Sequence, residues 1–307
     1  MHLFRSTPPS IHPVLSVLIL FISTVLTNAL ALAPYDNLTS TKELTTRTLP
    51  LSVSRHDLTS MQYQSLFDSL IPQGYRLLQV TGYVSAGQEC FAALFEQSPG
   101  PPQICYHGLT SEDYQIKFNQ TTAQGYKLVL VNGYTSTSGT DKYVAIFEKP
   151  TSSPAWVAWH GMTNADYQQR FNDWVAKGFK LTHVSGYGVS SEPRYAAIFE
   201  QLAGSPAWLA RLGMTSALYQ SVFDQQVAAG FTLTLVNGYS VNNVDYYAAI
   251  FEEVSGPKQW TARHGMTSTG YQNETDTLYN LGYRLKCLSG YTISDAGRFA
   301  AIWENMS

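Results

Sequence analysis

Five copies of one pattern fill most of this sequence, and their spacing of 51 to 53 residues constrains the fold more than any other feature. A threonine that follows a short apolar segment recurs at Thr59, Thr110, Thr163, Thr215 and Thr267. A Gly-Tyr pair recurs with its glycine at Gly82, Gly133, Gly186, Gly238 and Gly290, and a closing glutamate recurs at Glu96, Glu148, Glu200, Glu252 and Glu304. Independent markers that keep one period indicate structural repeats. We therefore predict a single repeat domain over residues 50–307, with units at 50–98, 101–150, 154–202, 206–254 and 257–305.

The third copy shows most clearly how one unit folds. Its apolar segment from Trp156 to His160 predicts a strand. Thr163 after it is a favourable helix N-cap, because its hydroxyl can accept a hydrogen bond from an unpaired backbone N–H. Apolar residues then recur at helical spacing up to Gly178, a residue type that suits the left-handed position closing a helix. Residues 180–185 and 195–200 predict two further strands, so each unit of about 52 residues is expected to run strand-helix-strand-strand.

One such unit cannot bury both faces of its apolar third strand, so neighbouring units must cover them. Five units can close into a propeller-like ring, or they can stack as an open solenoid. We favour the ring, because no terminal unit carries an obvious polar cap. The predicted fold class is an α/β (α+β) repeat protein with five strand-helix-strand-strand units in a propeller-like ring.

The N-terminus has the features of a secretory signal peptide. Arg5 supplies positive charge, an apolar stretch runs from Val14 to Leu26, and the small residues around Ala31 predict cleavage after it. We expect a signal peptide at residues 1–31, a flexible Thr-rich leader at 32–49, and a secreted, extracellular protein with no membrane association after signal cleavage. Export would give meaning to four glycosylation sequons, at Asn37, Asn119, Asn273 and Asn305.

Charge argues against one class of partner. The chain has 19 basic and 22 acidic residues and a net charge of −3, so it lacks the excess of positive charge that is typical of nucleic-acid-binding proteins. We also expect no cofactor.

Three cysteines allow at most one intramolecular disulfide. Cys90 opens the third strand of the first unit, and Cys105 lies near the end of the first strand of the second unit. We expect these two to form a disulfide, on the assumption that their strands are antiparallel neighbours. Cys287 is expected to be a buried thiol.

The recurring patterns His-Gly-Met-Thr, Tyr-Gln, Gly-Tyr and Tyr-Ala-Ala-Ile-Phe-Glu resemble bacterial tandem repeat domains. Similar units form the N-terminal domain of secreted fungal polyglycine hydrolases, and the resemblance covers roughly residues 50–305. In those hydrolases catalysis belongs to a second, β-lactamase-like domain with Ser-x-x-Lys and Lys-Thr-Gly motifs. The resemblance implies the accessory domain without this catalytic partner. We expect both motifs to be absent from this chain, and no catalytic residue is carried over.

The turns between the second and third strands differ most among the copies, and in any regular arrangement they share one rim. Loops on a rigid scaffold commonly carry recognition. The candidate binding residues in these turns are Asp141, Lys142, Glu192, Arg194, Asn243, Asp245, Asp295 and Arg298. Plain solvated turns are the alternative interpretation.

A histidine recurs at His56, His107, His160 and His264, and Leu212 replaces it in the fourth copy. In a ring these residues would occupy equivalent places, and close to the axis they could hold a metal. Zinc needs three or four converging ligands, and one unit supplies no second ligand, so we favour a hydrogen bond to the adjacent turn and predict no metal site.

Three functional hypotheses follow. The first is a secreted, non-catalytic recognition module, effector-like or lectin-like, that binds an extracellular protein or carbohydrate through the variable turns. The second is a hydrolase-type enzyme with a metal or thiol site in the ring, for which Cys287, His264 and Asp295 are the required residue types. The third is an accessory subunit of a separately encoded serine hydrolase.

Overall fold

The fold is taken from a computed structural model that describes residues 51–254 and 259–306. These residues form five consecutive units, each containing one helix and one three-stranded antiparallel sheet. The expected signal peptide, the Thr-rich leader and Asn37 lie outside the described residues. No helix in the described residues is long and apolar enough to cross a membrane.

The elements follow the same order in every unit. The first unit contains β1 (Ser52–Leu58), α1 (Ser60–Leu70), a 3₁₀ helix η1 (Ile71–Gln73), β2 (Tyr75–Ser85) and β3 (Gln88–Gln97), and the second contains β4 (Gln103–Leu109), α2 (Ser111–Ala123), β5 (Lys127–Thr135) and β6 (Asp141–Glu148). The third contains β7 (Trp156–Met162), α3 (Asn164–Ala176), β8 (Lys180–Val189) and β9 (Glu192–Glu200). The fourth contains β10 (Trp208–Thr215), α4 (Ser216–Ala228), β11 (Thr232–Val241) and β12 (Val244–Glu252), and the fifth contains β13 (Trp260–Thr267), α5 (Ser268–Asn280), β14 (Tyr283–Ile293) and β15 (Ala296–Asn305). The predicted strand-helix-strand-strand unit is confirmed.

The threonine marker acts as the helix N-cap in all five units. The Thr163 hydroxyl accepts a hydrogen bond from the backbone N–H of Asp166, whose carboxylate accepts one in return from the Thr163 backbone. This reciprocal pair is a capping box, which satisfies two unpaired donors at the start of the helix. The equivalent threonines Thr59, Thr110, Thr215 and Thr267 accept the same backbone hydrogen bond.

The last strand of each unit lies in the middle of its sheet. In the third unit the order is β7-β9-β8, with Trp159 and Val184 both opposite Ala197 of β9. Both faces of a middle strand are covered, which is why residues 195–199 are buried without alternation. The strand that leads from the helix, here β8, is the inner strand, and the strand before the helix is the outer one.

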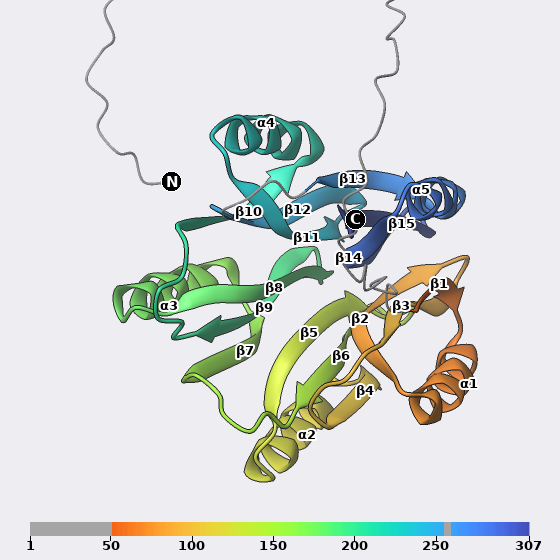
Figure 1. The fold of residues 1–307 in the computed structure, drawn as a ribbon, viewed down its shortest axis with the longest axis horizontal. Coiled ribbons are helices and arrows are strands. Elements are labelled where there is room, and N and C mark those ends of the chain that lie inside the picture. The colour runs from red at the N-terminus through yellow and green to blue at the C-terminus, as the bar shows by residue number, and fades with distance from the viewer. Residues whose placement is uncertain (1–50, 255–258, 307) are drawn as a thin grey trace, which may run out of the picture. The chain divides into compact units, whose positions relative to one another are not determined.

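The five units close into a ring around the inner strands β2, β5, β8, β11 and β14 (Figure 1). The ends of the ring meet through hydrogen bonds between β2 and β14. Thr81 Oγ1 donates to the Gly290 carbonyl at 3.0 Å, and the Val84 N–H donates to Thr292 Oγ1 at 2.8 Å. These bonds exclude an open solenoid for the five repeat units.

The Gly-Tyr motif is explained by the seams, the contacts between neighbouring units. A Cβ atom added to Gly186 would lie 2.6 Å from the ring of Tyr239, the tyrosine of the next unit. The same overlap arises at each of the five seams, the last one between Gly290 and Tyr83. Only glycine lets the inner strands approach this closely, so the motif serves the scaffold.

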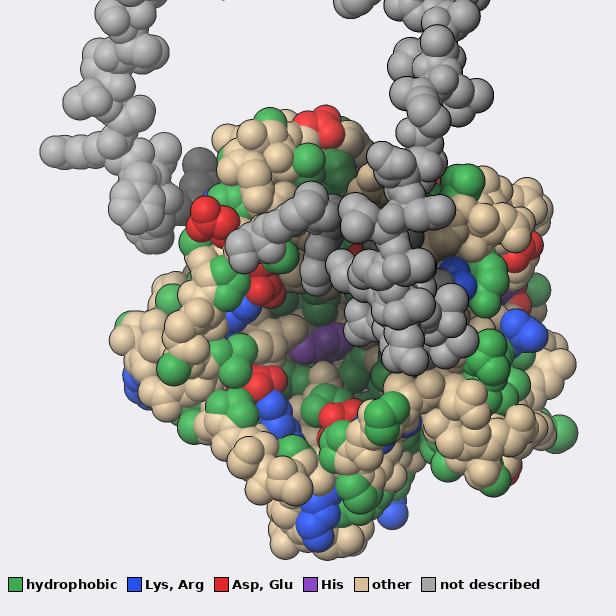
Figure 2. All heavy atoms as spheres, in the orientation of Figure 1, with side chains coloured by type: hydrophobic (Ala, Val, Ile, Leu, Met, Phe, Trp, Pro, Cys, Tyr) green, Lys and Arg blue, Asp and Glu red, His purple; other side chains and the backbone are tan. Residues whose placement is uncertain are grey.

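The closing glutamate joins neighbouring units at three seams. Arg76 pairs with Glu148 at 2.7 Å, Lys180 with Glu252 at 2.6 Å, and Lys127 with Glu200. In each case the base starts an inner strand and the acid ends the middle strand of the next unit. Figure 2 shows basic and acidic side chains next to one another around a central hollow.

The expected disulfide between Cys90 and Cys105 is wrong, because both thiols are free. The prediction assumed that the third strand of one unit pairs with the first strand of the next. Instead Cys90 lies opposite Tyr83 within its own sheet, and Cys105 lies opposite Ile146 in the following sheet. Because β3 already has β1 and β2 on its two sides, no edge is left for β4.

Candidate binding pocket on the ring axis

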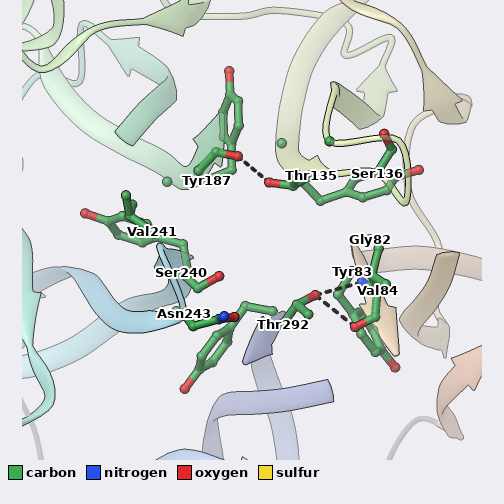
Figure 3. Close-up of a pocket in the computed structure, with 18 of the residues that line it drawn as sticks. Gly82, Tyr83, Val84, Thr135, Ser136, Tyr187, Ser240, Val241, Asn243 and Thr292 are labelled. Carbon is green, nitrogen blue, oxygen red and sulfur yellow. Dashed lines mark hydrogen bonds between the residues drawn. The ribbon is translucent and has the colours of Figure 1, made fainter. Parts of the chain in front are cut away.

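A space bounded by all five units lies on the ring axis, at the end where the inner strands finish. It has a volume of about 510 Å³, and its walls are the last residues of the inner strands and the turns that follow them. Figure 3 shows Thr135, Ser240 and Thr292, from three different inner strands, around this space. The turns that differ most among the repeats therefore do share one rim.

The wall presents hydroxyl, amide and backbone groups rather than charges. Its side chains include Thr135, Ser136, Ser240, Thr292 and Asn243, and among the lining residues Asp295 alone carries a carboxylate. In four of the five turns between the second and third strands both central residues have positive φ, as at Ser190 and Ser191, with values of 49° and 67°. Turns of this kind suit the twist of a two-residue hairpin and favour short polar residues.

A ring of buried polar side chains lies one residue before the Gly-Tyr pairs on the inner strands. It consists of Thr81, Asn132, Ser185, Asn237 and Ser289. Each of them accepts a hydrogen bond from the motif glycine N–H of the preceding unit, for example from Gly186 to Asn237 at 2.7 Å. Asn132 and Asn237 also donate to Ser185 and Ser289. A fully bonded polar network of this kind holds the inner strands in one arrangement.

The five tyrosines of the Gly-Tyr pairs line the pocket but turn their hydroxyls away into the seams. The Tyr187 hydroxyl lies 2.6 Å from that of Tyr143 and accepts the Gly161 N–H at 3.0 Å. Burial raises the pKa of the Tyr291 phenol to about 12. These phenols stay protonated at neutral pH, so they shape the pocket and do not serve as bases.

The predicted turn residues are only partly brought together. Asn243 and Asp295 line the pocket. Asp295 accepts the Gly87 N–H at 2.8 Å, and Asn243 accepts the Ser294 N–H at 3.1 Å, so both side chains also fix their turns.

The other six turn residues lie outside the lining of the pocket. Asp141 and Asp245 accept hydrogen bonds from the hydroxyls of nearby tyrosines. Lys142 forms an ion pair with Glu89 at 2.7 Å, and Glu192 is exposed. Arg194 and Arg298 each donate a hydrogen bond to the backbone carbonyl of the preceding residue.

Sequence reasoning missed the hydroxyl residues of the inner strands. Thr135, Ser240 and Thr292 each follow directly after a Gly-Tyr pair. Strict alternation along a strand puts the residues on either side of the buried tyrosine onto the opposite, axial face. That rule could have identified them.

The recurring histidines lie on the outer strands and cross the seams. His107 Nε2 lies 2.9 Å from Ser60 Oγ, at the start of the preceding unit's helix. Ser111 and Ser216 meet His160 and His264 in the same way, each at 3.1 Å. Leu212 faces the unit in which Asn164 replaces the serine, so both partners change together. His107, His160 and His264 bond to the neighbouring helix rather than to their own turn, whereas His56 contacts both Ser268 of the neighbouring helix and its own neighbour Asp57. The described residues contain no group of three or more metal-ligand side chains.

The seam between the fifth and first units carries an additional acid. Asp57 stands where the other units have glycine, and it adopts a positive φ of 53°. It accepts hydrogen bonds from Tyr83 at 2.8 Å and from Ser268, and His56 Nδ1 lies 2.9 Å away. The hydrogen bond with His56 is the main cause that lowers the pKa of Asp57 to about 2. Burial is the largest single influence on His56 and lowers its pKa, but the hydrogen bond and charge of Asp57 and the hydrogen bond to Gln272 together raise that pKa.

The thiol site considered from the sequence does not assemble. Cys287 lies on an inner strand, donates to the Val236 carbonyl, and has its pKa raised to about 11 by burial. His264 contacts Ser216 across a seam, and Asp295 bonds to the backbone of a turn of the first unit. A protonated thiol without a nearby base is not an activated nucleophile.

The expected absence of the Ser-x-x-Lys motif from this chain is wrong. A Ser-x-x-Lys spacing does occur, from Ser255 to Lys258, in the connection between the fourth and fifth units. These residues lie outside the described part of the chain.

The closed ring of five blades with an axial pocket defines a propeller-like repeat protein. A family model described as "Polyglycine hydrolase-like, structural repeat" matches the chain five times, at residues 50–98, 100–150, 153–202, 205–254 and 257–306. The chain belongs to this family, and the predicted repeat domain is confirmed.

Proposed function

We propose that this protein is a secreted recognition module that binds an extracellular glycan in the axial pocket. The observation that supports the proposal is the lining of the 510 Å³ pocket, where hydroxyl, amide and backbone groups from five units converge and one carboxylate is present. A pocket of this volume can hold a ligand of drug-like size.

A neutral ligand with many hydroxyl groups matches this wall. Serine and threonine hydroxyls can both donate and accept, as sugar hydroxyls do. The wall holds no lysine, arginine or histidine and carries one acid, so it offers little to a strongly charged ligand. It also lacks a base beside a nucleophile, which is why binding rather than catalysis is proposed.

The test is binding of a glycan array and of matched oligosaccharides in solution. Ser240→Tyr places a large side chain in the pocket, and Ser153→Tyr makes the same change at an exposed loop position. Loss of glycan binding is expected in the first variant and not in the second. Equal binding by both variants would locate the glycan elsewhere, and binding of extended peptides alone would replace glycan with protein as the ligand.

The family description supports a second candidate function, as an accessory module for a polyglycine hydrolase. In this role the ring would bind the hydrolase or its substrate. Purified ring added to such an enzyme should change its activity on a large substrate more than on a short peptide. No change on either substrate would speak against the role.

A further inference from the structure

A second cavity lies at the seam between the fifth and first units, at the opposite end of the inner strands from the axial pocket. Its volume is about 200 Å³. Helix α5 provides Gln272, Thr275, Asp276 and Tyr279, strand β1 provides Ser52, Ser54 and Arg55, and the remaining lining residues are Leu94, Tyr283, Leu285 and Trp303.

The cavity lies where this seam lacks two aromatic residues that other seams carry; the seam between the fourth and fifth units keeps both rings and has a space of about 630 Å³ at the equivalent place, so the two cavities differ in their lining. At three other seams a helix phenylalanine packs against a tryptophan at the start of the next unit. The ring centroids are 5.9 Å apart for Phe118 and Trp156, 6.0 Å for Phe171 and Trp208, and 5.7 Å for Phe223 and Trp260. At the seam between the first and second units Phe67 keeps the helix ring, and Gln103 replaces the tryptophan.

In the fifth unit Thr275 replaces the phenylalanine, and Ser52 of the first unit replaces the tryptophan. Two large rings thus give way to two small hydroxyl side chains at one seam.

The lining of this cavity is half polar. Tyr279 is 43% exposed and offers an aromatic ring, while Leu94, Leu285 and Trp303 form buried apolar wall. Asp276 accepts one hydrogen bond, from Gln272 at 2.8 Å, and a carboxylate has capacity for several more. Arg55 donates to the Ser54 carbonyl at 2.8 Å and keeps further N–H donors.

We propose that this cavity binds a single sugar residue, as a free monosaccharide or as the end of a glycan. A sugar ring presents one apolar face, which suits the aromatic and aliphatic wall, and hydroxyls around its edge, which suit a carboxylate, an amide and a guanidinium. An aromatic side chain of a peptide would leave those polar groups without partners. The volume lies below the ~300–1,000 Å³ of pockets for drug-sized ligands, which limits the occupant to about one ring.

The test refills the cavity with the residue that the other four helices carry. Thr275→Phe restores the aromatic ring, so it should keep or raise the melting temperature while it removes the site. It also destroys the Asn273 sequon. Asn273→Gln therefore serves as the control that removes the sequon and leaves the cavity open, and Thr275→Ser keeps both sequon and cavity.

Binding is measured by saturation-transfer NMR and calorimetry with glucose, galactose, mannose, xylose and N-acetylglucosamine. We expect at least one sugar to bind the wild type, with a loss of at least ~tenfold in affinity in Thr275→Phe and less than ~twofold in both controls. Asp276→Ala removes the carboxylate at an exposed position, so it tests the sugar site a second time without changing how the seam packs.

Two results would overturn the proposal: a wild type that binds none of the five sugars, or a Thr275→Phe variant that binds as well as the wild type. The inference is independent of the axial pocket. Ser240→Tyr blocks the axial pocket, so sugar binding that persists in this variant and is removed by adding Thr275→Phe belongs to the seam cavity, and failure of one site is distinguishable from failure of the other.

Discussion

The contact between Gly186 and Tyr239 offers the sharpest test of how the ring is held together. In Gly186→Ala the new methyl carbon would start 2.6 Å from the tyrosine ring, whereas carbon atoms pack at about 3.5–4.0 Å. One side must therefore move by about 1 Å. The ring of Tyr239 is 2% exposed, and its hydroxyl lies 3.2 Å from that of Tyr195, so it has little freedom to retreat.

The magnitude follows from two contributions. Overpacking of a well-filled core costs about 1–3 kcal/mol, and a displaced tyrosine would lose a hydrogen bond worth about 1 kcal/mol. We expect Gly186→Ala to lower the free energy of unfolding by roughly 3 kcal/mol. Gly178→Ala is the matched control, because its Cβ meets nothing within 4 Å although its φ is 81°. Backbone strain alone should cost it about 1 kcal/mol.

Urea unfolding, followed by fluorescence, measures both variants together with Tyr239→Leu and the double variant Gly186→Ala/Tyr239→Leu. If the steric account is right, the leucine removes the overlap, and the double variant is more stable than the sum of the two single losses by at least about 1 kcal/mol. Additive losses, or a Gly186→Ala variant no less stable than Gly178→Ala, would refute the explanation of the Gly-Tyr motif.

Three further predictions concern the seams. Asp57→Asn should lower the free energy of unfolding by about 1 kcal/mol at pH 7, a value reduced because the Asp57 side chain is partly exposed. The pKa of Asp57 is lowered to about 2, so its contribution to stability is present above about pH 4 and is lost as the pH falls toward 2, where the urea midpoints of wild type and variant should converge. The double change Leu212→His with Asn164→Ser should recreate the histidine–serine contact at the seam that lacks it. The melting temperature of the double variant should then exceed the value expected from adding the changes that the two single variants show. A reducing agent should leave the melting temperature unchanged, because Cys90 and Cys105 are free thiols; a fall would indicate a disulfide after all.

The unit itself could be predicted from the sequence because its signals are local. A capping threonine such as Thr163, helical spacing and a closing glycine such as Gly178 act within a few residues of one another. The order of strands in the sheet is not local. The misplaced disulfide of Cys90 shows the difference, since connection along the chain does not tell which strand lies in the middle.

The roles of residues at the seams were equally hidden from a single unit. His107 looks like a residue for its own turn until the serine of the preceding helix is placed beside it. Thr275 departs from the phenylalanine of the other helices, but the cavity becomes evident only when Ser52, some 220 residues earlier, comes to the same seam. The repeats themselves held this information, because Leu212 and Asn164 change as a pair.

The hydrogen bonds that join β14 to β2 include, from Gly290 to Thr81, the bond that the motif glycine makes at each of the other four seams. Such a ring has no privileged starting point. Any of the connections between units could carry the termini of a circularly permuted chain, and all five seams would still form. Because these connections follow the residues opposite the start of the inner strands, a second domain could be attached at several places around the ring, at the other end from the axial pocket.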